Sequence, residues 1–357
     1  MDYPASGGSQ ACFLVARTSS TPPLLSLAPK TVEHTADSTN AEMLGEMRLR
    51  IVEYERVNAD FDSGAPNEFN SNFHTAEEAP DLPIPSNAPT SFERWLPLVM
   101  RSRGLQDGAL QVVSLTSVQV RLLVLAAGAS VHTRVLNRAY AEDLEEQVAP
   151  AFGSLVFPTQ GLFMRLAACS TKDGAQKAPG NMSISSVDDI ILQLTTSLRA
   201  WSALNNAVNS RAPCLSIFFL PFDPRMDTAQ EYRVFCAPET MKITAVSQYR
   251  WHKPWRFAGR SEEERIAIAR SIFAGIQNTH AAIVRDVRAG NAMDDLLRQQ
   301  GFTFDVLFDE SRSSCELIEL NTFGVRSACG SCLFHWVEHR DLLYGERSEK
   351  VDFAVTM

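Results

Sequence analysis

Three oxygen-bearing side chains late in the chain have the types and spacing of a metal site. Asp305 lies in the segment F-D-V, and Glu319 and Asn321 lie in the segment I-E-L-N shortly after it. Residues i and i+2 of a strand face the same side, so Glu319 and Asn321 project together, and a hairpin partner brings Asp305 beside them. Two carboxylates and an amide suit a hard cation that keeps waters and binds phosphate oxygens, as magnesium does in nucleotide sites. The same spacing also fits a solvated hairpin face, so on the residues alone both interpretations stay open.

Arg165 and Lys172 are candidates for binding phosphate. Arg165 stands inside the apolar segment G-L-F-M-R-L, where a cation needs a buried anionic partner, and Lys172 lies in the polar loop S-T-K-D-G. A single loop lysine is usually solvated, so this loop alone is a weak signal. Arg233 alternates with Glu231 in E-Y-R-V-F, and Gln248 ends another apolar segment. Each of these could equally belong to an ordinary cross-strand pair.

Two cysteines and two histidines near the end of the chain offer zinc-competent side chains. Cys329, Cys332, His335 and His339 follow the spacing C-x2-C-x2-H-x3-H. The spacer between the second cysteine and the first histidine is far shorter than in a zinc finger, and the apolar residues among them indicate the start of a core-packing helix. We therefore favour packing over a structural zinc. The sequence has no G-x-x-x-x-G-K-[ST] or G-x-G-x-x-G loop, so a nucleotide site must use another design.

The elements that position these residues follow from hydrophobic periodicity. Apolar runs predict strands over 111–124, 161–166, 215–220, 231–237, 241–248, 302–308 and 315–320. Amphipathic spacing predicts helices over 139–148, 186–204 and 261–289. This order mixes antiparallel hairpins with crossovers, which indicates an α+β fold rather than a doubly wound sheet.

Residues 1–88 differ in composition from the rest of the chain. They are rich in Ser, Thr, Pro, Ala, Asn and Glu, and stretches such as 75–89 have neither a helical nor a strand period. We therefore predict a mostly disordered N-terminal extension over 1–88 and a folded domain over 89–350. The exception is 42–58, where the spacing of apolar residues predicts one short amphipathic helix.

Composition and charge exclude several classes of function. The 357 residues are 45% hydrophobic, which is enough for a sizeable core, and the formal net charge is -9. General nucleic-acid and membrane-surface binders usually carry a cationic excess. The longest apolar stretch is too short to cross a bilayer, the first residues lack a signal-peptide pattern, and seven cysteines, an odd number, favour a reducing compartment. We therefore expect a cytoplasmic protein without membrane or direct nucleic-acid contacts.

Several blocks between residue 92 and about 345 resemble the cell division cycle protein 123 family, a eukaryotic branch of the ATP-grasp fold. The family's F-D-V, I-D-F-N-P-F and L-F-x-W are similar to F-D-V-L-F-D, I-E-L-N-T-F-G and L-F-H-W in this chain. Its E-F-R-C-F-V and I-S-Q-R-D are similar to E-Y-R-V-F-C and V-S-Q-Y-R. Its V-F-x-K-L and S-x-P-K-D-A are similar to L-F-M-R-L and C-S-T-K-D-G. Order and approximate spacing agree as well.

The resemblance implies an ATP-grasp fold in which two α+β subdomains sandwich a nucleotide, behind a disordered N-terminal extension. It implies ATP and Mg²⁺ as cofactors, and it puts residues 217–223 on a hinge strand whose backbone reads the adenine edge. The magnesium ligands that it implies are Asp305, Glu319 and Asn321. The ATP-binding residues that it implies are Arg165, Lys172, Phe219, Leu220, Arg233 and Gln248.

The chain departs from the family pattern around an intact metal triad. Arg165 replaces a lysine, Glu319 replaces an aspartate, and Thr322 replaces a proline. Tyr249 stands where the family has an arginine, although Arg250 follows immediately. These substitutions indicate a diverged member.

The resemblance leads to three hypotheses about function. The family helps to assemble eukaryotic translation initiation factor 2 and acts on its gamma subunit as an ATP-dependent chaperone, so an assembly factor with that partner is the first. The second is an ATP-grasp enzyme that activates a carboxylate as an acyl phosphate for an amine, or transfers a phosphoryl group to an unknown acceptor. The third is a degenerate nucleotide-binding module.

Overall fold

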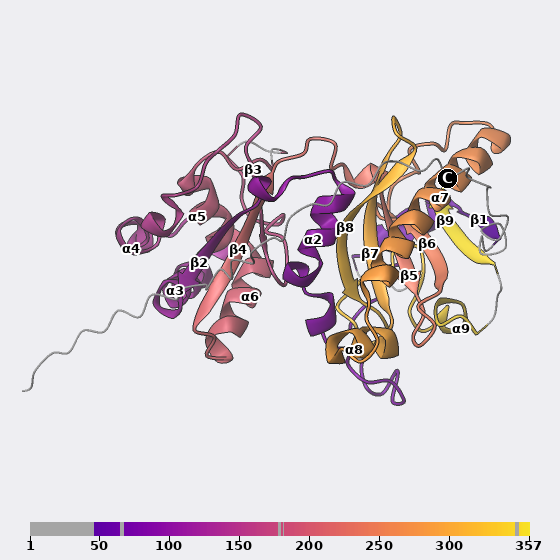
Figure 1. Cartoon of the computed structure of the whole chain (residues 1–357), viewed down its shortest axis with the longest axis horizontal. Helices are drawn as coiled ribbons and strands as arrows, with labels where there is room; N and C mark the ends of the chain where they lie inside the picture. Colours follow the sequence, from indigo (N-terminus) through magenta and orange to yellow (C-terminus); the bar gives the residue numbers. More distant parts are fainter. Residues whose placement is uncertain (1–45, 65–67, 178–179, 181, 347–349) are drawn as a thin grey trace, which may run out of the picture. The chain divides into compact units, whose positions relative to one another are not determined.

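Two β-sheets organise the computed structural model of the chain, which describes residues 46–64, 68–177, 180, 182–346 and 350–357 (Figure 1). A six-stranded sheet has the order β1-β9-β6-β5-β7-β8, and a three-stranded sheet has the order β2-β4-β3. The strands are β1 (Met47–Val52), β2 (Gln111–Thr116), β3 (Leu162–Leu166), β4 (Cys214–Pro221), β5 (Glu231–Cys236), β6 (Ile243–Gln248), β7 (Phe302–Asp309), β8 (Ser314–Thr322) and β9 (Val351–Thr356). The α+β class expected from the sequence is confirmed.

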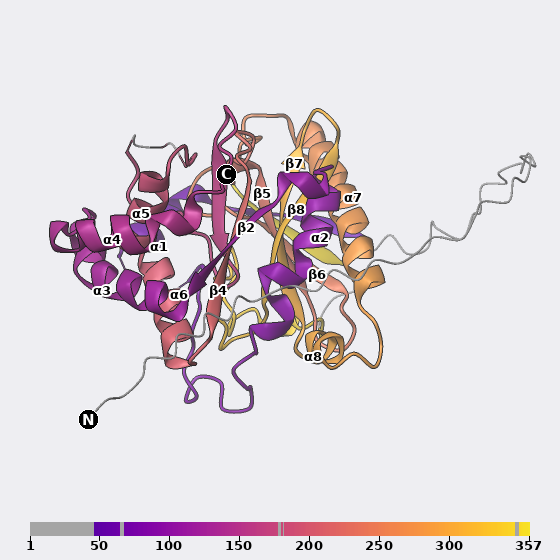
Figure 2. The same cartoon turned by 60° about the vertical axis from the view of Figure 1, so that its left-hand side comes forward.

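Helices cover both sheets. In chain order they are α1 (Tyr54–Asp62), α2 (Phe92–Ser102), α3 (Ser117–Thr133), α4 (Ala141–Gln147), α5 (Val187–Thr196), α6 (Leu198–Asn209), α7 (Glu262–Asp286), α8 (Ala292–Gln300) and α9 (Arg340–Leu343). Helices α2 and α7 both pack against β8 and lie on the same side of the six-stranded sheet (Figure 2). Helices α3, α5 and α6 pack together beside the three-stranded sheet.

The six-stranded sheet separates an apolar face from a polar one. Val234 on β5 and Phe304 on β7 are fully buried in the core that also contains Ile276 of α7. Successive side chains of a strand point to opposite faces, so Arg233 and Asp305 project away from the helices. The pleat therefore places the charged residues on the side where a ligand can approach.

A small residue fixes the long helix against the β7–β8 hairpin. A side chain at Gly275 would place its Cβ 2.8 Å from the Sγ of Cys315 and 3.0 Å from the Cys315 backbone nitrogen. One turn further along α7, the hydroxyl of Thr279 donates a hydrogen bond of 3.1 Å to the carbonyl of Cys315. Because α7 can approach β8 so closely, the hairpin that carries Asp305 and Glu319 rests on a rigid support.

The three-stranded sheet has a different division of faces. Leu115, Met164 and Phe219 are buried against α3, α5 and α6. Arg165 and Phe218 alternate onto the other face, where the rings of Phe92 and Phe218 meet edge to face at 6.0 Å. A single charged side chain on an otherwise apolar strand thus faces away from the helices.

The helix predicted over 42–58 is wrong for much of its length. Residues 47–52 form β1, which pairs in parallel with β9, and a helix begins only at Tyr54. The edge of the six-stranded sheet supplies hydrogen-bond partners that outweigh the helical spacing of the side chains. Residues 1–45 lie outside the described residues. The sheet nevertheless extends on both sides of the 89–350 range that the composition suggests, because it includes β1 and β9.

Two further elements differ from their predictions because of helix caps. The predicted strand over 111–124 ends at Thr116, whose side chain forms a capping box with Gln119 and starts α3. The predicted helix over 186–204 is broken into α5 and α6 by Ser197, which ends the first and caps the second. Local side-chain to backbone hydrogen bonds thus decide both boundaries.

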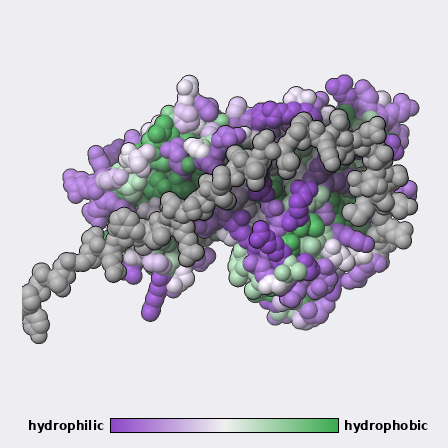
Figure 3. Space-filling model, in the orientation of Figure 1, coloured by the Kyte–Doolittle hydropathy of each residue, from purple (hydrophilic) through white to green (hydrophobic). Residues whose placement is uncertain are grey.

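Most large apolar side chains of the described residues are buried in the cores between the sheets and the helices. The face seen in Figure 3 is mainly hydrophilic, with hydrophobic residues gathered in small patches. Within the described ranges, no helix combines the length and the apolar composition needed to cross a membrane.

Candidate functional site

The β7–β8 hairpin brings together the three residues predicted to bind a metal. Asp305 pairs with Glu319 in the antiparallel register, and the register shifts immediately after Asp305. The side-chain amide of Asn321 donates a hydrogen bond of 3.1 Å to Oδ2 of Asp305. Two carboxylates and an amide therefore lie within one short stretch of paired strand, as the spacing of the sequence predicts.

Arg233 holds Asp305 through a bidentate ion pair. The two residues are opposite each other on β5 and β7, and the guanidinium donates from Nε to Oδ1 at 2.8 Å and from Nη2 to Oδ2 at 2.7 Å. Only 7% of Arg233 and 1% of Asp305 is exposed. The remaining Nη1 donates to the carbonyl of Gly330 at 2.7 Å. Burial raises the pKa of Asp305 although the charge of Arg233 acts in the opposite direction.

Arg165 finds the anionic partner that its apolar strand requires. Its guanidinium pairs with the carboxylate of Glu319, so a residue of the three-stranded sheet contacts a residue of the six-stranded sheet. Burial alone would raise the pKa of Glu319, but the charges of Arg165 and other nearby cations outweigh it and lower the pKa to about 2. The guanidinium also lies 4.5 Å from the ring centre of Phe92, and its buried Nε has no hydrogen-bond partner among the described residues.

The loop that carries Lys172 is fixed by the start of α6. The carboxylate of Asp173 accepts hydrogen bonds from the hydroxyl of Ser197 at 2.6 Å and from the backbone N–H of Arg199 at 3.2 Å. Lys172 then donates to the hydroxyl of Tyr249 at 2.8 Å. Tyr249, at the position where the resemblance implies an arginine, thus connects the predicted phosphate-binding loop to the end of β6.

Three of the predicted ATP-binding residues do not reach the polar face. The side-chain amide of Gln248 donates to two carbonyls of residues 250–253 at 2.9 and 2.7 Å and accepts from the backbone of Thr356 at 2.9 Å. Gln248 therefore shapes the turn after β6 instead of facing a ligand. Phe219 points into the helical core of the three-stranded sheet, and its backbone lies between two neighbouring strands. Leu220 is buried in the core of the six-stranded sheet.

A cavity of about 540 Å³ opens beside the hairpin, a volume in the usual range of small-molecule sites. Polar and charged side chains form most of its lining. The polar and charged members are Asn70, Asn72, Arg199, Thr228, Arg233, Arg250, His252, Glu319 and Asn321, with Tyr249 and Trp251 as aromatic members. The loop at 328–332 contributes Ala328, Cys329, Gly330 and Cys332. The cavity is lined by two of the three predicted metal ligands, Glu319 and Asn321, together with residues for which the sequence predicts no role.

The donor set at the hairpin fits a hard divalent cation. The set contains two carboxylates and one amide. Among the described residues, no group of three or more His, Cys, Asp or Glu side chains is placed to hold a metal ion by itself. A cation here would take the carboxylates of Asp305 and Glu319 and the amide oxygen of Asn321, and complete its shell with water or phosphate oxygens, as magnesium does. Both carboxylates already bind arginines, so a cation would replace a guanidinium at one or both of them.

The four zinc-competent side chains are not gathered at one point. The thiol of Cys329 contacts Thr303, and the thiol of Cys332 lies 3.9 Å from the carbonyl of Tyr249. The Nδ1 of His335 instead accepts hydrogen bonds from backbone N–H groups just after it, at 3.3 and 3.1 Å. The packing role favoured on spacing agrees with this arrangement.

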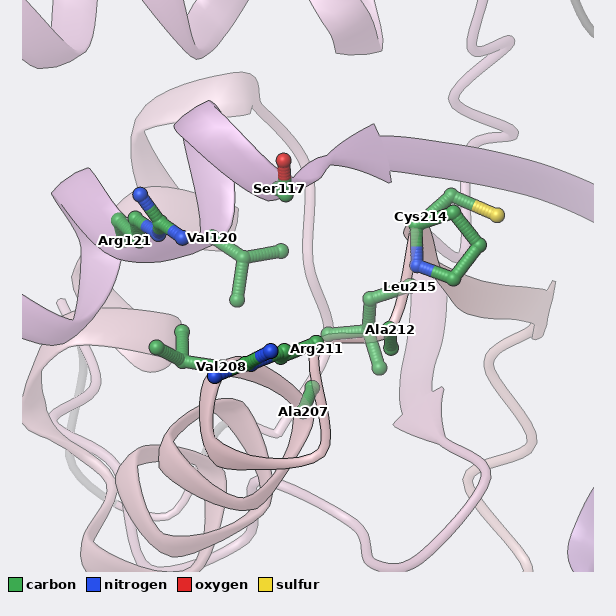
Figure 4. Close-up of a pocket in the computed structure, with 10 residues that line it drawn as sticks. Ser117, Val120, Arg121, Ala207, Val208, Arg211, Ala212, Cys214 and Leu215 are labelled. Carbon is green, nitrogen blue, oxygen red and sulfur yellow. The ribbon is translucent and has the colours of Figure 1, made fainter.

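A second cavity lies away from the hairpin, between α3 and the turn from α6 to β4 (Figure 4). Its volume is about 210 Å³, and its walls include the apolar side chains of Val120, Val208 and Leu215. Arg121 and Arg211 are the charged residues of its lining. Because it contains no carboxylate and none of the residues predicted for a site, we place the candidate site in the larger cavity.

The sequence predicts no role for Arg199, and it indicates only a cross-strand pattern for Glu231. Arg199 is the second residue of α6 and lines the larger cavity, and the Ser197 cap just before it is the signal that could have marked the position. Burial raises the pKa of Glu231 to about 7, although the nearby charge of Lys172 lowers it. A carboxyl group that titrates near neutral pH beside paired charges is a feature of many functional sites.

These features define an α+β protein with a charged cavity beside a β-hairpin of its larger sheet. No protein-family model matches the sequence, and no curated protein matches it. Among solved structures, the chain is similar to Cdc123 from Schizosaccharomyces pombe, with 16% identity and a TM-score of 0.50 over 76% of this chain and 99% of that chain. A C-terminally truncated Cdc123 from the same organism matches with 15% identity and a TM-score of 0.48 over 75% of this chain and 96% of that chain. The chain has a Cdc123-like fold, and the expected resemblance is confirmed at the level of the fold.

Proposed function

We propose that the protein binds ATP together with a magnesium ion beside the β7–β8 hairpin, in an ATP-grasp arrangement. The observation that carries the proposal is the meeting of Asp305, Glu319 and Asn321 with two arginines, one from each sheet, next to a cavity of about 540 Å³. The Cdc123-like fold and the blocks of resemblance support the same assignment.

The ion pairs suggest how the chain would receive the ligand. Magnesium, when bound, would neutralise negative charge on the triphosphate. The buried Nε of Arg165 has no hydrogen-bond partner in the described part of the chain, so it could donate to a phosphate oxygen once Glu319 turns to the cation. Three nitrogens of Arg233 already donate hydrogen bonds, two to Asp305 and one to the carbonyl of Gly330. Arg233 would therefore keep its place and fix the position of Asp305.

The test is the thermal midpoint of unfolding with and without ATP and magnesium. A ligand that binds only the folded state stabilises it, by about 2.7 kcal/mol at a concentration one hundred times its Kd. We expect the wild type to shift upward and Asn321→Ala to lose most of the shift. Asn321 belongs to the cation ligands but to neither ion pair, so this variant should remain folded.

A matched control separates loss of the site from loss of the fold. Glu263→Gln removes an exposed carboxylate from the first turn of α7 and should leave the ATP shift unchanged. No ATP shift in a folded wild type would reject the proposal. An equal shift in the wild type and in Asn321→Ala would reject the hairpin as the cation site.

We further propose that the protein acts as an assembly factor in the cytoplasm, with the gamma subunit of translation initiation factor 2 as its partner. The resemblance of the sequence blocks to the cell division cycle protein 123 family supports this partner. Purified gamma subunit should bind the chain in an ATP-dependent way, without formation of a chemical product. If the subunit fails to bind while the ATP shift is present, the nucleotide site stands and the partner assignment fails.

An ATP-grasp enzyme is the second candidate, because the cavity beside the hairpin is also lined by Arg199 and Arg250, which could bind an acceptor. Such an enzyme would consume ATP once its acceptor is present, whereas an assembly factor would not need an acceptor. ATP consumption that depends on a small-molecule acceptor would therefore favour the enzyme.

A further inference from the structure

The larger cavity has a second wall that the metal triad and its arginines do not account for. This wall is formed by the start of α6, the turn after β6 and the loop around residue 70. Its members with hydrogen-bonding capacity include Arg199, Arg250, His252 and Asn70. They line the same cavity as Glu319, which belongs to the proposed nucleotide site, but they lie on different elements.

The two arginines of this wall have no ion-pair partner among the residues that the structure describes. At the hairpin, Arg233 is paired with Asp305 and Glu319 is paired with Arg165. Arg199 and Arg250 form no ion pair with any described residue. The Nη1 of Arg199 donates only to the hydroxyl of Ser170, at 3.2 Å. The cavity lining therefore has a cationic excess, although the whole chain has a formal net charge of -9.

The carboxylate next to the backbone of Arg199 is already engaged. Asp173 lies beside Arg199, but both of its oxygens accept hydrogen bonds at the start of α6, at 2.6 and 3.2 Å. Cations that face a cavity without a carboxylate partner are typical of a site for an oxyanion.

His252 and Asn70 are further polar members of this wall. The ring of His252 stacks on Phe61 at 4.4 Å, and its buried Nδ1 has no hydrogen-bond partner among the described residues. Asn70 has a positive φ of 51°, and its Oδ1 accepts from the backbone of Cys332 at 3.1 Å. No described residue accepts from the Nδ2 of Asn70, which leaves it as a further donor. Gln248 anchors the carbonyl of Arg250 at 2.9 Å, so the turn that presents this arginine is held in place.

We propose that this wall binds the carboxylate or phosphate group of a second small molecule, with Arg199 and Arg250 as its cations. The inference rests on the proposed function, because it names the class of ligand that would lie beside the bound nucleotide. It also concerns residues that are separate from the metal triad, so its test can succeed or fail independently.

The experiment titrates inorganic phosphate and succinate at constant ionic strength and follows the thermal midpoint of the full-length chain. The proteins are the wild type, Arg199→Gln, Arg250→Gln and the control Arg270→Gln, which removes an exposed arginine from α7. Loss of one charged hydrogen-bond donor weakens binding by about tenfold or more. We therefore expect both cavity variants to need about tenfold more of the anion for the same shift, and Arg270→Gln to match the wild type.

The ATP–magnesium shift of the same variants separates the two proposals. The inference is supported if Arg250→Gln loses its anion response and keeps the ATP shift. It is also supported as an anion site if the wild type responds to phosphate through Arg250 but not to ATP, and in that case the proposed function fails instead. Equal anion responses in all four proteins would overturn the inference. So would equal losses of the anion and ATP responses in Arg199→Gln and Arg250→Gln, because the arginines would then belong to the nucleotide site. Arg250→Lys, which keeps the charge, should retain part of the response and shows that the turn still folds.

Discussion

The two sheets handle charge in opposite ways. The three-stranded sheet buries apolar side chains against its helices and carries one charged residue, Arg165, on its other face. The six-stranded sheet places several charged residues on its polar face, including Arg233 and Asp305, which are almost completely buried. Asp305 and Arg233 are paired across neighbouring strands, and Glu319 is paired with Arg165 of the other sheet.

The difference indicates where the chemistry of the protein is built. Buried ion pairs are costly to desolvate and contribute little net stability compared with well-packed apolar residues. A sheet that keeps them on the face beside a cavity does so in spite of this cost, and such arrangements are typical of binding sites. The three-stranded sheet contributes packing and a single cation, and the six-stranded sheet contributes the ligands.

The largest expected effect comes from breaking the innermost pair. Asp305→Ala should lower the free energy of unfolding by about 3 to 5 kcal/mol, because it leaves the guanidinium of Arg233 buried without its counter-ion. The measurement is urea denaturation at neutral pH. Replacing both partners, as in Asp305→Ala with Arg233→Met, should recover part of the loss since no uncompensated charge remains.

An apolar deletion in the other sheet is the matched comparison. Leu115 is fully buried against the helices of the three-stranded sheet, and Leu115→Ala should cost about 2 to 5 kcal/mol through the cavity it leaves. Adding Arg233→Met to this variant should give no recovery. Recovery in both backgrounds would mean that Arg233 is unfavourable by itself, and the contrast between the sheets would not hold.

The hairpin was predictable from the sequence because it depends on local spacing. The period of two in adjacent strands places Asp305, Glu319 and Asn321 on one face. Arg165 lies among apolar neighbours, so an anionic partner for it could be expected. By contrast, β1 and β9 are far apart in the chain, and their parallel pairing depends on tertiary contacts that no local period records. The role of Gln248 was equally hidden, because its partners include the backbone of the last strand.

A pH dependence should sharpen the contrast further. Burial raises the pKa of Glu231 to about 7 in the folded protein, above its value in the unfolded chain. The proton is then held more tightly by the folded state, so the stability from this group is present below about pH 4.5 and is lost as the pH rises through 7. The loss should amount to about 3 kcal/mol between these limits. Denaturation midpoints measured from pH 5 to 8 should show it.

The variant Glu231→Gln isolates this contribution. It cannot ionise, so its stability should fall less between pH 5 and 8 than that of the wild type, and it should be the more stable protein at pH 8. Leu115→Ala, which removes no titratable group, should keep the pH profile of the wild type. Parallel profiles for the wild type and Glu231→Gln would contradict the raised pKa.

The smallest expected effect concerns the loop at 328–332, in which the carbonyl of Gly330 accepts a hydrogen bond from Arg233. A Cβ at Gly330 would lie 2.2 Å from Oδ1 of Asn70, so Gly330→Ala should force this side chain away from the backbone of Cys332. Losing that hydrogen bond should cost about 1 kcal/mol. The variant Asn70→Ala gives the necessary background, because it removes the colliding atom and the hydrogen bond together. Gly330→Ala should then add almost nothing to the cost of Asn70→Ala in a double-mutant cycle. If Gly330→Ala lowers the free energy of unfolding equally in both backgrounds, the added methyl group acts on the Gly330 carbonyl that binds Arg233. The polar face would then tolerate less change than its contacts indicate.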